Sequence, residues 1–172
     1  MVTTIKKILF TTDLSDSAKE VFKQTIRLAG SCQASVTMLH VIEETTSNAK
    51  NLVIDMMGKE AYEKLEKDNK DYVQNIMLGK RKEAPIIQQT LEKLAQQSGV
   101  HSDGKMVQID DTIVIMGNIA DEIVYVADKN DCDIIVMGYH VKNIIAELML
   151  GGKTRRVMRH STIPVYLVPV HD

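Results

Sequence analysis

The residues best suited to chemistry lie in the last third of the chain, where glycines follow an apolar run. Asp133 to Met137 reads as a buried strand, since the residues after the Asp are all apolar. Gly138 is expected at the carboxyl end of that strand, and a pair of glycines, Gly151 and Gly152, follows further along. Glycines leave backbone N–H groups accessible, and a helix start offers N–H groups and a positive dipole end to an anion. The pattern predicts a phosphate cradle.

His140 stands two residues after Gly138 in this expected ligand loop. Histidine can act as an acid, a base or a metal ligand. No second histidine or cysteine stands at metal-ligand spacing, and no serine or cysteine nucleophile has a recognisable base. We therefore interpret His140 as a loop residue and expect neither a metal site nor a catalytic centre. His40, near the end of an earlier apolar run, is interpreted as a hydrogen-bonded packing residue.

Composition excludes several classes of protein. The chain of 172 residues is 44% hydrophobic, which suits one domain with its own core, residues 1–172. A net charge of -2 gives no electrostatic reason to expect a nucleic-acid or membrane partner, and no apolar run approaches the ~18 residues that span a bilayer. Cys32 and Cys132 lack a disulfide or metal spacing, so we expect two buried thiols in a soluble, cytoplasmic protein.

Strand and helix patterns alternate in the first quarter of the chain. Ile8 to Thr12 reads as a buried strand that stops at Asp13. A helix follows, and Ser17 with Glu20 three residues later predicts a capping box at its start. Gly30 is expected at the end of this helix. Ala34 to Ile42 is the second expected strand.

The middle of the chain, residues 43–104, reads as a variable insertion and a long helical region. Glu43 to Met57 lacks a clear period, and a helical pattern with a break near Gly79 and Pro85 then runs to about Gln97. The charged stretch from Lys59 to Lys70 is interpreted as the solvated face of a helix with i,i+4 ion pairs.

The remaining elements complete an α/β pattern. Of two apolar stretches, Met106 to Ile109 and Thr112 to Met116, the second is expected to be the third strand. A helix from Asn118, the strand from Asp133 to Met137, a last helix ending near His160 and a strand between Pro164 and Pro169 follow. Five strands alternating with helices predict a doubly wound parallel sheet with right-handed crossovers.

Several segments in this order resemble the universal stress protein family over almost the full length of the chain. They are Lys7 to Ser15, Leu39 to Ile42, Asp133 to Gly138, Leu150 to Gly152, Val157 to His160 and Ile163 to Val165. The resemblance implies an open five-stranded parallel sheet of order 3-2-1-4-5 with helices on both faces, the Rossmann-like arrangement of the adenine nucleotide alpha hydrolase type. It also implies a homodimer that pairs the last strands, here through Val165, Tyr166, Leu167 and Val168.

The ATP-binding members of that family carry the pattern G-x-x-G, nine residues, then G-[ST]. Gly138 and Gly151 match it, whereas Val141 replaces the second glycine and Gly152 replaces the serine or threonine. A β-branched residue adds bulk and disfavours a positive φ, and the loss of the hydroxyl removes one phosphate donor. Thr154 offers a replacement hydroxyl.

The resemblance also assigns further site positions. Asp13 matches an acidic residue near the ribose and phosphates, although its carboxylate suits equally well a capping role on the amides of Ser15 or Asp16. Val41 matches the position whose backbone reads adenine. Lys153 and Arg155 are expected to face either phosphates or solvent. The full expected site comprises Thr12, Asp13, Val41, Met137, Gly138, His140, Val141, Gly151, Gly152, Lys153 and Thr154.

Two functions fit this sequence. In the first, the protein is a nucleotide-binding stress-response module that holds ATP or AMP, with Mg²⁺ beside ATP, and at most hydrolyses ATP slowly. In the second, it is a member of the same family that binds no nucleotide and acts through a protein partner. The second predicts that Val141 and its loop fill the crevice.

Overall fold

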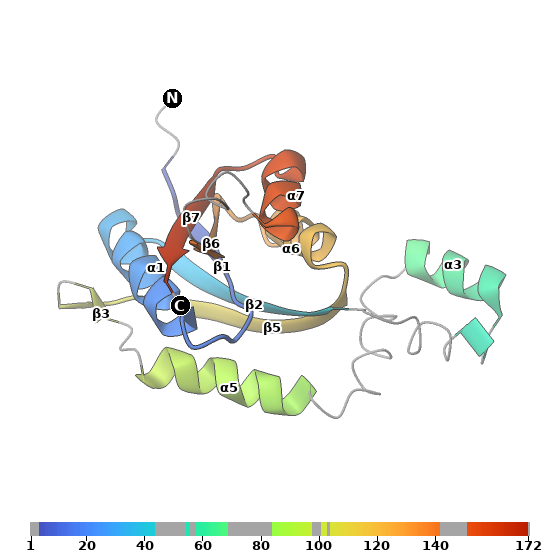
Figure 1. Cartoon of the computed structure of the whole chain (residues 1–172), viewed down its shortest axis with the longest axis horizontal. Helices are drawn as coiled ribbons and strands as arrows, with labels where there is room; N and C mark the ends of the chain where they lie inside the picture. The colour runs from blue at the N-terminus through green and yellow to red at the C-terminus, as the bar shows by residue number, and fades with distance from the viewer. Residues whose placement is uncertain are drawn as a thin grey trace.

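Five parallel strands form one open, twisted sheet (Figure 1). The computed structural model describes residues 4–43, 54–55, 58–68, 84–97, 101–102, 104–141 and 151–171. The sheet order is β5-β2-β1-β6-β7, in which the strands are β1 (Lys7–Thr11), β2 (Ser35–Glu43), β5 (Ile109–Gly117), β6 (Ile134–His140) and β7 (Val165–Val170). In chain order this is 3-2-1-4-5, so the expected doubly wound topology is confirmed.

Helices cover both faces of the sheet. The helices are α1 (Ala18–Cys32), α3 (Lys59–Asp68), α5 (Ala84–Gln97), α6 (Ile119–Lys129) and α7 (Gly152–His160). Helices α1 and α5 pack on one face, α6 and α7 pack on the other, and α3 lies to the side of the sheet (Figure 1). Among the residues whose placement is described, no helix is both long and apolar enough to cross a membrane.

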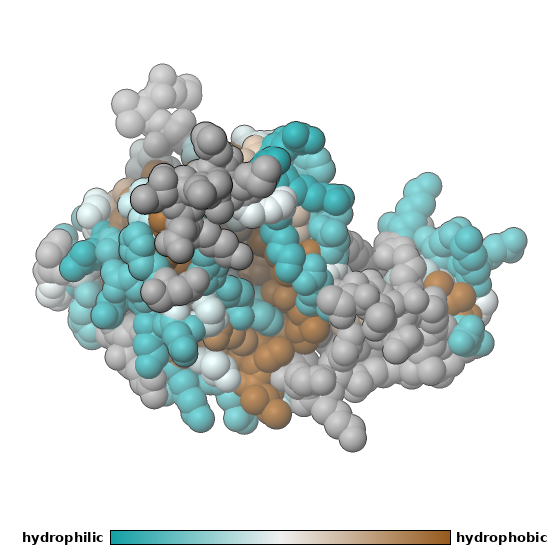
Figure 2. All heavy atoms as spheres, viewed as in Figure 1, coloured by the Kyte–Doolittle hydropathy of each residue, from teal (hydrophilic) through white to brown (hydrophobic). Residues whose placement is uncertain are grey.

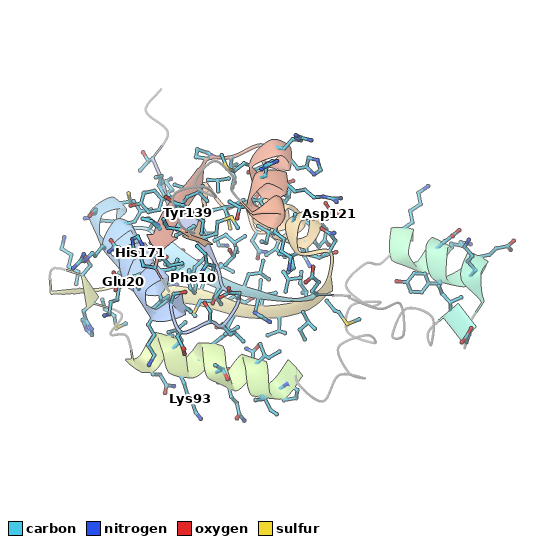
Figure 3. The ribbon with its side chains drawn as sticks, viewed as in Figure 1. Phe10, Glu20, Lys93, Asp121, Tyr139 and His171 are labelled. Carbon is cyan, nitrogen blue, oxygen red and sulfur yellow. The ribbon has the colours of Figure 1, made fainter. Side chains whose placement is uncertain are left out.

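The three middle residues of the central strand β1, Ile8, Leu9 and Phe10, are apolar because both faces of this strand are buried. Ile8 and Phe10 point into the core under α1, while Leu9 points into the core under α6. Phe10, labelled in Figure 3, meets Phe22 of α1 edge-to-face with 5.2 Å between ring centroids. Such aromatic pairs add to the burial energy of their rings. Both faces of β1 are therefore covered, as a parallel strand requires.

The start of α1 differs from the expected capping box. Ser17 is the N-cap residue, but its backbone is already helical (φ -74°, ψ -10°) and its side chain makes no capping hydrogen bond. Its hydroxyl instead lies 2.9 Å from that of Ser15. A capping side chain needs an extended N-cap backbone to reach the amides of the first turn. The capping-box prediction is therefore wrong.

The end of α1 also differs from the prediction. The helix continues past Gly30 to Cys32, and Gln33 ends it in the left-handed conformation (φ 55°). Gly30 has a packing role instead. It faces the small hairpin of β3 (His101–Ser102) and β4 (Lys105–Met106), where a Cβ added to Gly30 would lie 2.2 Å from the Cβ of Ser102.

Three later boundaries are corrected by strand pairing. β6 runs on from Met137 to His140 because Gly138 and His140 pair with Val168 and Val170 of β7. Gly138 therefore lies inside the strand, and the interpretation of His140 as a loop residue is wrong, since it ends the strand. β5 begins at Ile109 and includes the two aspartates expected to precede it. Met106 belongs to the separate β3–β4 hairpin. The last strand includes Pro169, which an edge strand tolerates.

The charged helix expected in the insertion is present as α3. In α3, Lys59 and Glu63 form an exposed i,i+4 ion pair of 3.8 Å, which confirms the solvated face. Residues 44–53 and the expected break at Gly79 lie outside the described residues.

Cys132 is buried, and this burial raises the pKa of its thiol to about 11. Cys32 is only partly buried, so the prediction of two buried thiols is wrong for this residue.

The contact of Gly30 with Ser102 gives a stability prediction. Gly30→Ala should lower the free energy of unfolding by about 1–3 kcal/mol, because the new methyl group overpacks against Ser102. In a Ser102→Gly background the same change should be neutral or stabilising by up to about 1 kcal/mol, the usual gain of alanine in a helix. Urea denaturation measures both values. Equal effects in the two backgrounds would refute the contact.

Candidate functional site

A cleft of about 1180 Å³ lies at the carboxyl ends of β1, β2 and β6. After β1 the chain passes to α1 on one face of the sheet, whereas after β6 it reaches α7 on the other face. Because neighbouring strands send the chain to opposite faces, a crevice opens between them, and ligands bind there in open α/β sheets. The fold itself therefore creates this cleft.

The structure brings together all the expected site residues except one. Lining the cleft are Thr12, Asp13, Val41, Met137, Gly138, His140, Gly151, Gly152, Lys153 and Thr154. Val141 is not among the lining residues. Its N–H donates to the carbonyl of Val170 at 3.0 Å and thereby continues the pairing of β6 with β7.

The loop after β1 is fixed by one hydrogen bond to β2 and one within the loop. The N–H of Thr12 donates to the carbonyl of Leu39, and the Thr12 hydroxyl accepts from the N–H of Leu14, both at 3.0 Å. Leu14 has a positive φ of 62°, which turns the chain sharply between β1 and α1. The turn leaves Thr12 and Asp13 on the wall of the cleft.

Asp13 is both a loop-fixing and a cleft-facing residue. Its Oδ1 accepts from the N–H of Ser15 at 2.9 Å, one of the two amides expected for a capping role, but Ser15 precedes α1 and its N-cap Ser17, so this bond fixes the loop and does not cap the helix. Its Oδ2 lies 3.7 Å from Nε2 of His140. Burial works to raise the pKa of Asp13, but hydrogen bonds from the hydroxyl and amide of Ser15, together with the nearby His140, hold that pKa below its usual value. The cleft thus keeps an ionised carboxylate at neutral pH.

His40 contributes a second imidazole to the lining. Its Nδ1 lies 2.8 Å from the carbonyl oxygen of Thr12. Since a carbonyl only accepts, Nδ1 carries the proton. The hydrogen-bonded packing role expected for His40 is confirmed, and its place on the cleft wall was missed. The only signal was its position one residue before Val41 in β2.

The first turn of α7 faces the cleft. Gly151 is its N-cap residue and makes no side-chain cap, and the first turn holds no acidic residue. Among the described residues, no atom lies within 4 Å of a Cβ added at Gly151 or Gly152. Thr154, in the same turn, is buried against the cleft. N–H groups of a first turn have no intrahelical partners, so this helix end suits an anion.

Two cations on α7 join the wall of the cleft. Nζ of Lys153 lies 2.6 Å from Oε2 of Glu43, at the end of β2. One helical turn later, Arg156 makes two hydrogen bonds to Asp121 of α6, at 3.0 and 3.2 Å (Figure 3 labels Asp121). Glu43 and Arg156 were missed by sequence reasoning. The i,i+3 spacing of Lys153 and Arg156 was the available signal.

Apolar side chains line the remaining walls. Val21, Ile87 and Val170 lie on the α1 side of the sheet, and Ile119 and Ile123 lie on the α6 side. Figure 2 shows hydrophobic residues exposed in the middle of the viewed face, between more polar surfaces. Over the part of the chain that is described, no group of three or more histidine, cysteine or acidic side chains is placed to hold a metal ion.

Comparison with known proteins places this geometry in a family. The model of the universal stress protein family matches residues 4–169. The chain belongs to the universal stress protein family. Universal stress protein MJ0577 of Methanocaldococcus jannaschii is 28% identical over 95% of this chain and 94% of its own. Universal stress protein YxiE of Bacillus subtilis is 26% identical over 94% of this chain and 97% of its own.

Solved structures agree on the fold. Universal stress protein UspA from Lactobacillus plantarum superposes with a TM-score of 0.64 at 20% identity, over 96% of this chain and 99% of its own. The structure of MJ0577 has a TM-score of 0.57 at 28% identity, over 99% of both chains. A universal stress protein in complex with cAMP has a TM-score of 0.60 at 17% identity, over 97% of this chain and 98% of its own.

In this universal stress protein, the two departures from the glycine pattern have different structural consequences. Val141 continues the sheet pairing and is not among the described residues with positive φ, so its β-branched side chain causes no backbone strain there. Gly152 leaves open space beside the first turn of α7. Neither substitution closes the cleft within the described residues.

The lowered pKa of Asp13 predicts a pH-dependent contribution to stability. Such a group stabilises the fold above its unfolded pKa, near 3.9, and loses that contribution as pH falls through the lower folded pKa. The Asp13→Asn variant keeps an oxygen acceptor for Ser15 but no charge. We expect wild type to exceed it in stability at pH 7, with the gap shrinking below pH 4. Urea unfolding at pH 7 and pH 3 measures this gap, and a pH-independent gap would contradict the assignment.

Proposed function

We propose that this universal stress protein is a nucleotide-binding stress-response module that holds ATP or AMP in the cleft, with Mg²⁺ beside ATP. The observation that carries the proposal is the uncapped start of α7, with Gly151 and Gly152, beside an open cleft. A cleft with apolar walls, a few placed polar groups and a helix N-terminus suits a ligand that joins a flat base to phosphates.

Each wall has a role in this proposal. The backbone of Val41 lies against the adenine, and the carboxylate of Asp13 accepts hydrogen bonds from the ribose hydroxyls. Gly138, Gly152 and Thr154 lie against the phosphates. A universal stress protein of the same fold was solved with cAMP, so this fold accommodates an adenine nucleotide. The proposed chemistry is binding, with slow hydrolysis of ATP at most.

The second candidate is a family member that binds no nucleotide and acts through a protein partner. It predicts that Val141 and its loop fill the crevice. The position of Val141 favours the first candidate, because this residue pairs with β7 and does not line the cleft. The rest of the loop, residues 142–150, lies outside the described residues.

A carboxylate placed at Gly152 tests the proposal. Gly152→Glu has room for its side chain, and an acidic residue in a first turn favours the helix, so the variant should fold. We expect calorimetric titration to show ATP and AMP binding to wild type and at least a tenfold loss in the variant. Met106→Glu adds the same charge on the exposed hairpin and should bind like wild type. Absence of heat and of thermal stabilisation in wild type at millimolar nucleotide would contradict the proposal.

We also propose that the protein is a homodimer formed through β7, by way of Val165, Tyr166, Leu167 and Val168. β7 is an edge strand, which presents unpaired backbone groups, and a second copy can pair with them across a two-fold axis. Tyr166 is 43% exposed in the single chain, whereas Val165 and Leu167 pack partly against the core. Tyr166 is therefore the side chain of this set most available to a partner.

A charge at Tyr166 tests this geometry. Tyr166→Lys should convert a dimer into monomers, because like charges would meet near the two-fold axis. Ile86→Lys, an equally drastic change at an exposed position of α5, should leave the dimer intact. Size-exclusion chromatography with light scattering gives the masses. A dimeric Tyr166→Lys variant, or a monomeric wild type, would refute the pairing of β7.

A further inference from the structure

Three positively charged or protonatable side chains on the cleft wall each face a carboxylate from another part of the chain. Lys153 contacts Glu43, Arg156 contacts Asp121, and His140 lies 3.7 Å from Asp13. The first pair joins the end of β2 to the first turn of α7, and both of its residues line the cleft, as do those of the third pair. The first pair also has the shortest separation, 2.6 Å.

Glu43 balances the positive charge of Lys153 at the start of α7. The N-terminus of a helix carries a partial positive charge, and Lys153 adds a full one in the same turn. The first turn has no acidic residue of its own that would balance this charge. The carboxylate of Glu43 provides the missing negative charge from β2. It does so through Nζ of Lys153, so an anion that binds to this lysine meets Glu43 as a competitor.

The ion pair is also exposed enough to be exchanged. The side chains of Lys153 and Glu43 are 56% and 42% exposed. Exposed ion pairs contribute little to stability, and at most a few-fold to an equilibrium constant. A phosphate group at the same place offers more charge and more acceptor oxygens than one carboxylate. A ligand with several phosphates can thus displace Glu43 at small cost.

We propose that Glu43 is an internal competitor for the phosphate site: a bound phosphate group takes Lys153 from Glu43, and this competition lowers the preference of the cleft for phosphate-bearing nucleotides over adenosine. The inference rests on the proposed nucleotide function and deepens it. Glu43 is then a specificity-determining residue, because its carboxylate weakens the binding of every ligand that carries a phosphate. Adenosine, which has no phosphate, binds without breaking the pair.

The test measures the affinities of adenosine, AMP and ATP by calorimetry in a buffer with chelator and no Mg²⁺. Glu43→Gln should strengthen ATP binding about twofold to fivefold, the factor that an exposed ion pair supports, and leave adenosine unchanged. Lys153→Met should weaken ATP binding, and Glu43→Gln should have no effect in that background, which is the signature of a coupled pair. Glu63→Gln is the matched control. It removes a carboxylate from the exposed pair with Lys59 on α3 and should change nothing.

Other results would overturn the inference. Unchanged or weaker ATP binding by Glu43→Gln, with wild type binding nucleotide, would refute the competition and leave the proposed function intact. An equal gain for adenosine and ATP would indicate a wider cleft and not competition for phosphate. With Mg²⁺ added, a loss of ATP affinity in Glu43→Gln would make Glu43 a metal ligand. If neither wild type nor variant binds any of the three probes, the proposed function and the inference fail together.

Discussion

The side chain of Asp133 fixes the register on which the cleft depends. Its Oδ2 accepts the N–H groups of Lys6 and Lys7 at 2.7 and 2.9 Å, and its own N–H donates to the carbonyl of Lys7. These bonds join the start of β6 to the start of β1. Parallel strands continue in the register in which they begin, so Thr11 and Met137 end side by side. A slip of one residue would turn every cleft-facing side chain away.

The divergence of the chain beyond these two strands then opens the cleft. β1 leads to α1 and β6 leads to α7, on opposite faces of the sheet, so neither of these two helices covers the strand ends between them. The walls are apolar where α1 and α6 pack, and polar where the loop after β1 approaches α7. In the proposed function, the apolar wall buries the base and the polar wall receives the phosphates. Topology places the crevice at these strand ends, and the side chains of the surrounding elements make one wall apolar and the other polar.

Charge on the polar wall is balanced across elements. Asp13 stays ionised because Ser15 and His140 stabilise its carboxylate against the cost of burial. Glu43 balances Lys153, and the bidentate contact of Asp121 holds Arg156 against α6. Most of these groups are half exposed, so the pairs can rearrange around a ligand. The charged side chains of the polar wall thus pair with opposite charges, although the first turn of α7 favours an anion.

The alternation of buried strands and helices predicted the doubly wound class, and the glycines placed the cleft after the strand that begins at Asp133, because these are local patterns. The strand order and the site positions Asp13 and Val41 came from the family resemblance, and ten of the eleven expected residues line the cleft. The local patterns misplaced the cap at Ser17 and the role of Gly30, since these depend on backbone angles and on a hairpin distant in sequence. Tertiary structure alone decided that Val141 pairs with β7 and that Glu43 meets Lys153. These contacts join segments far apart in the chain, and no local pattern records which distant groups the fold brings within hydrogen-bonding distance.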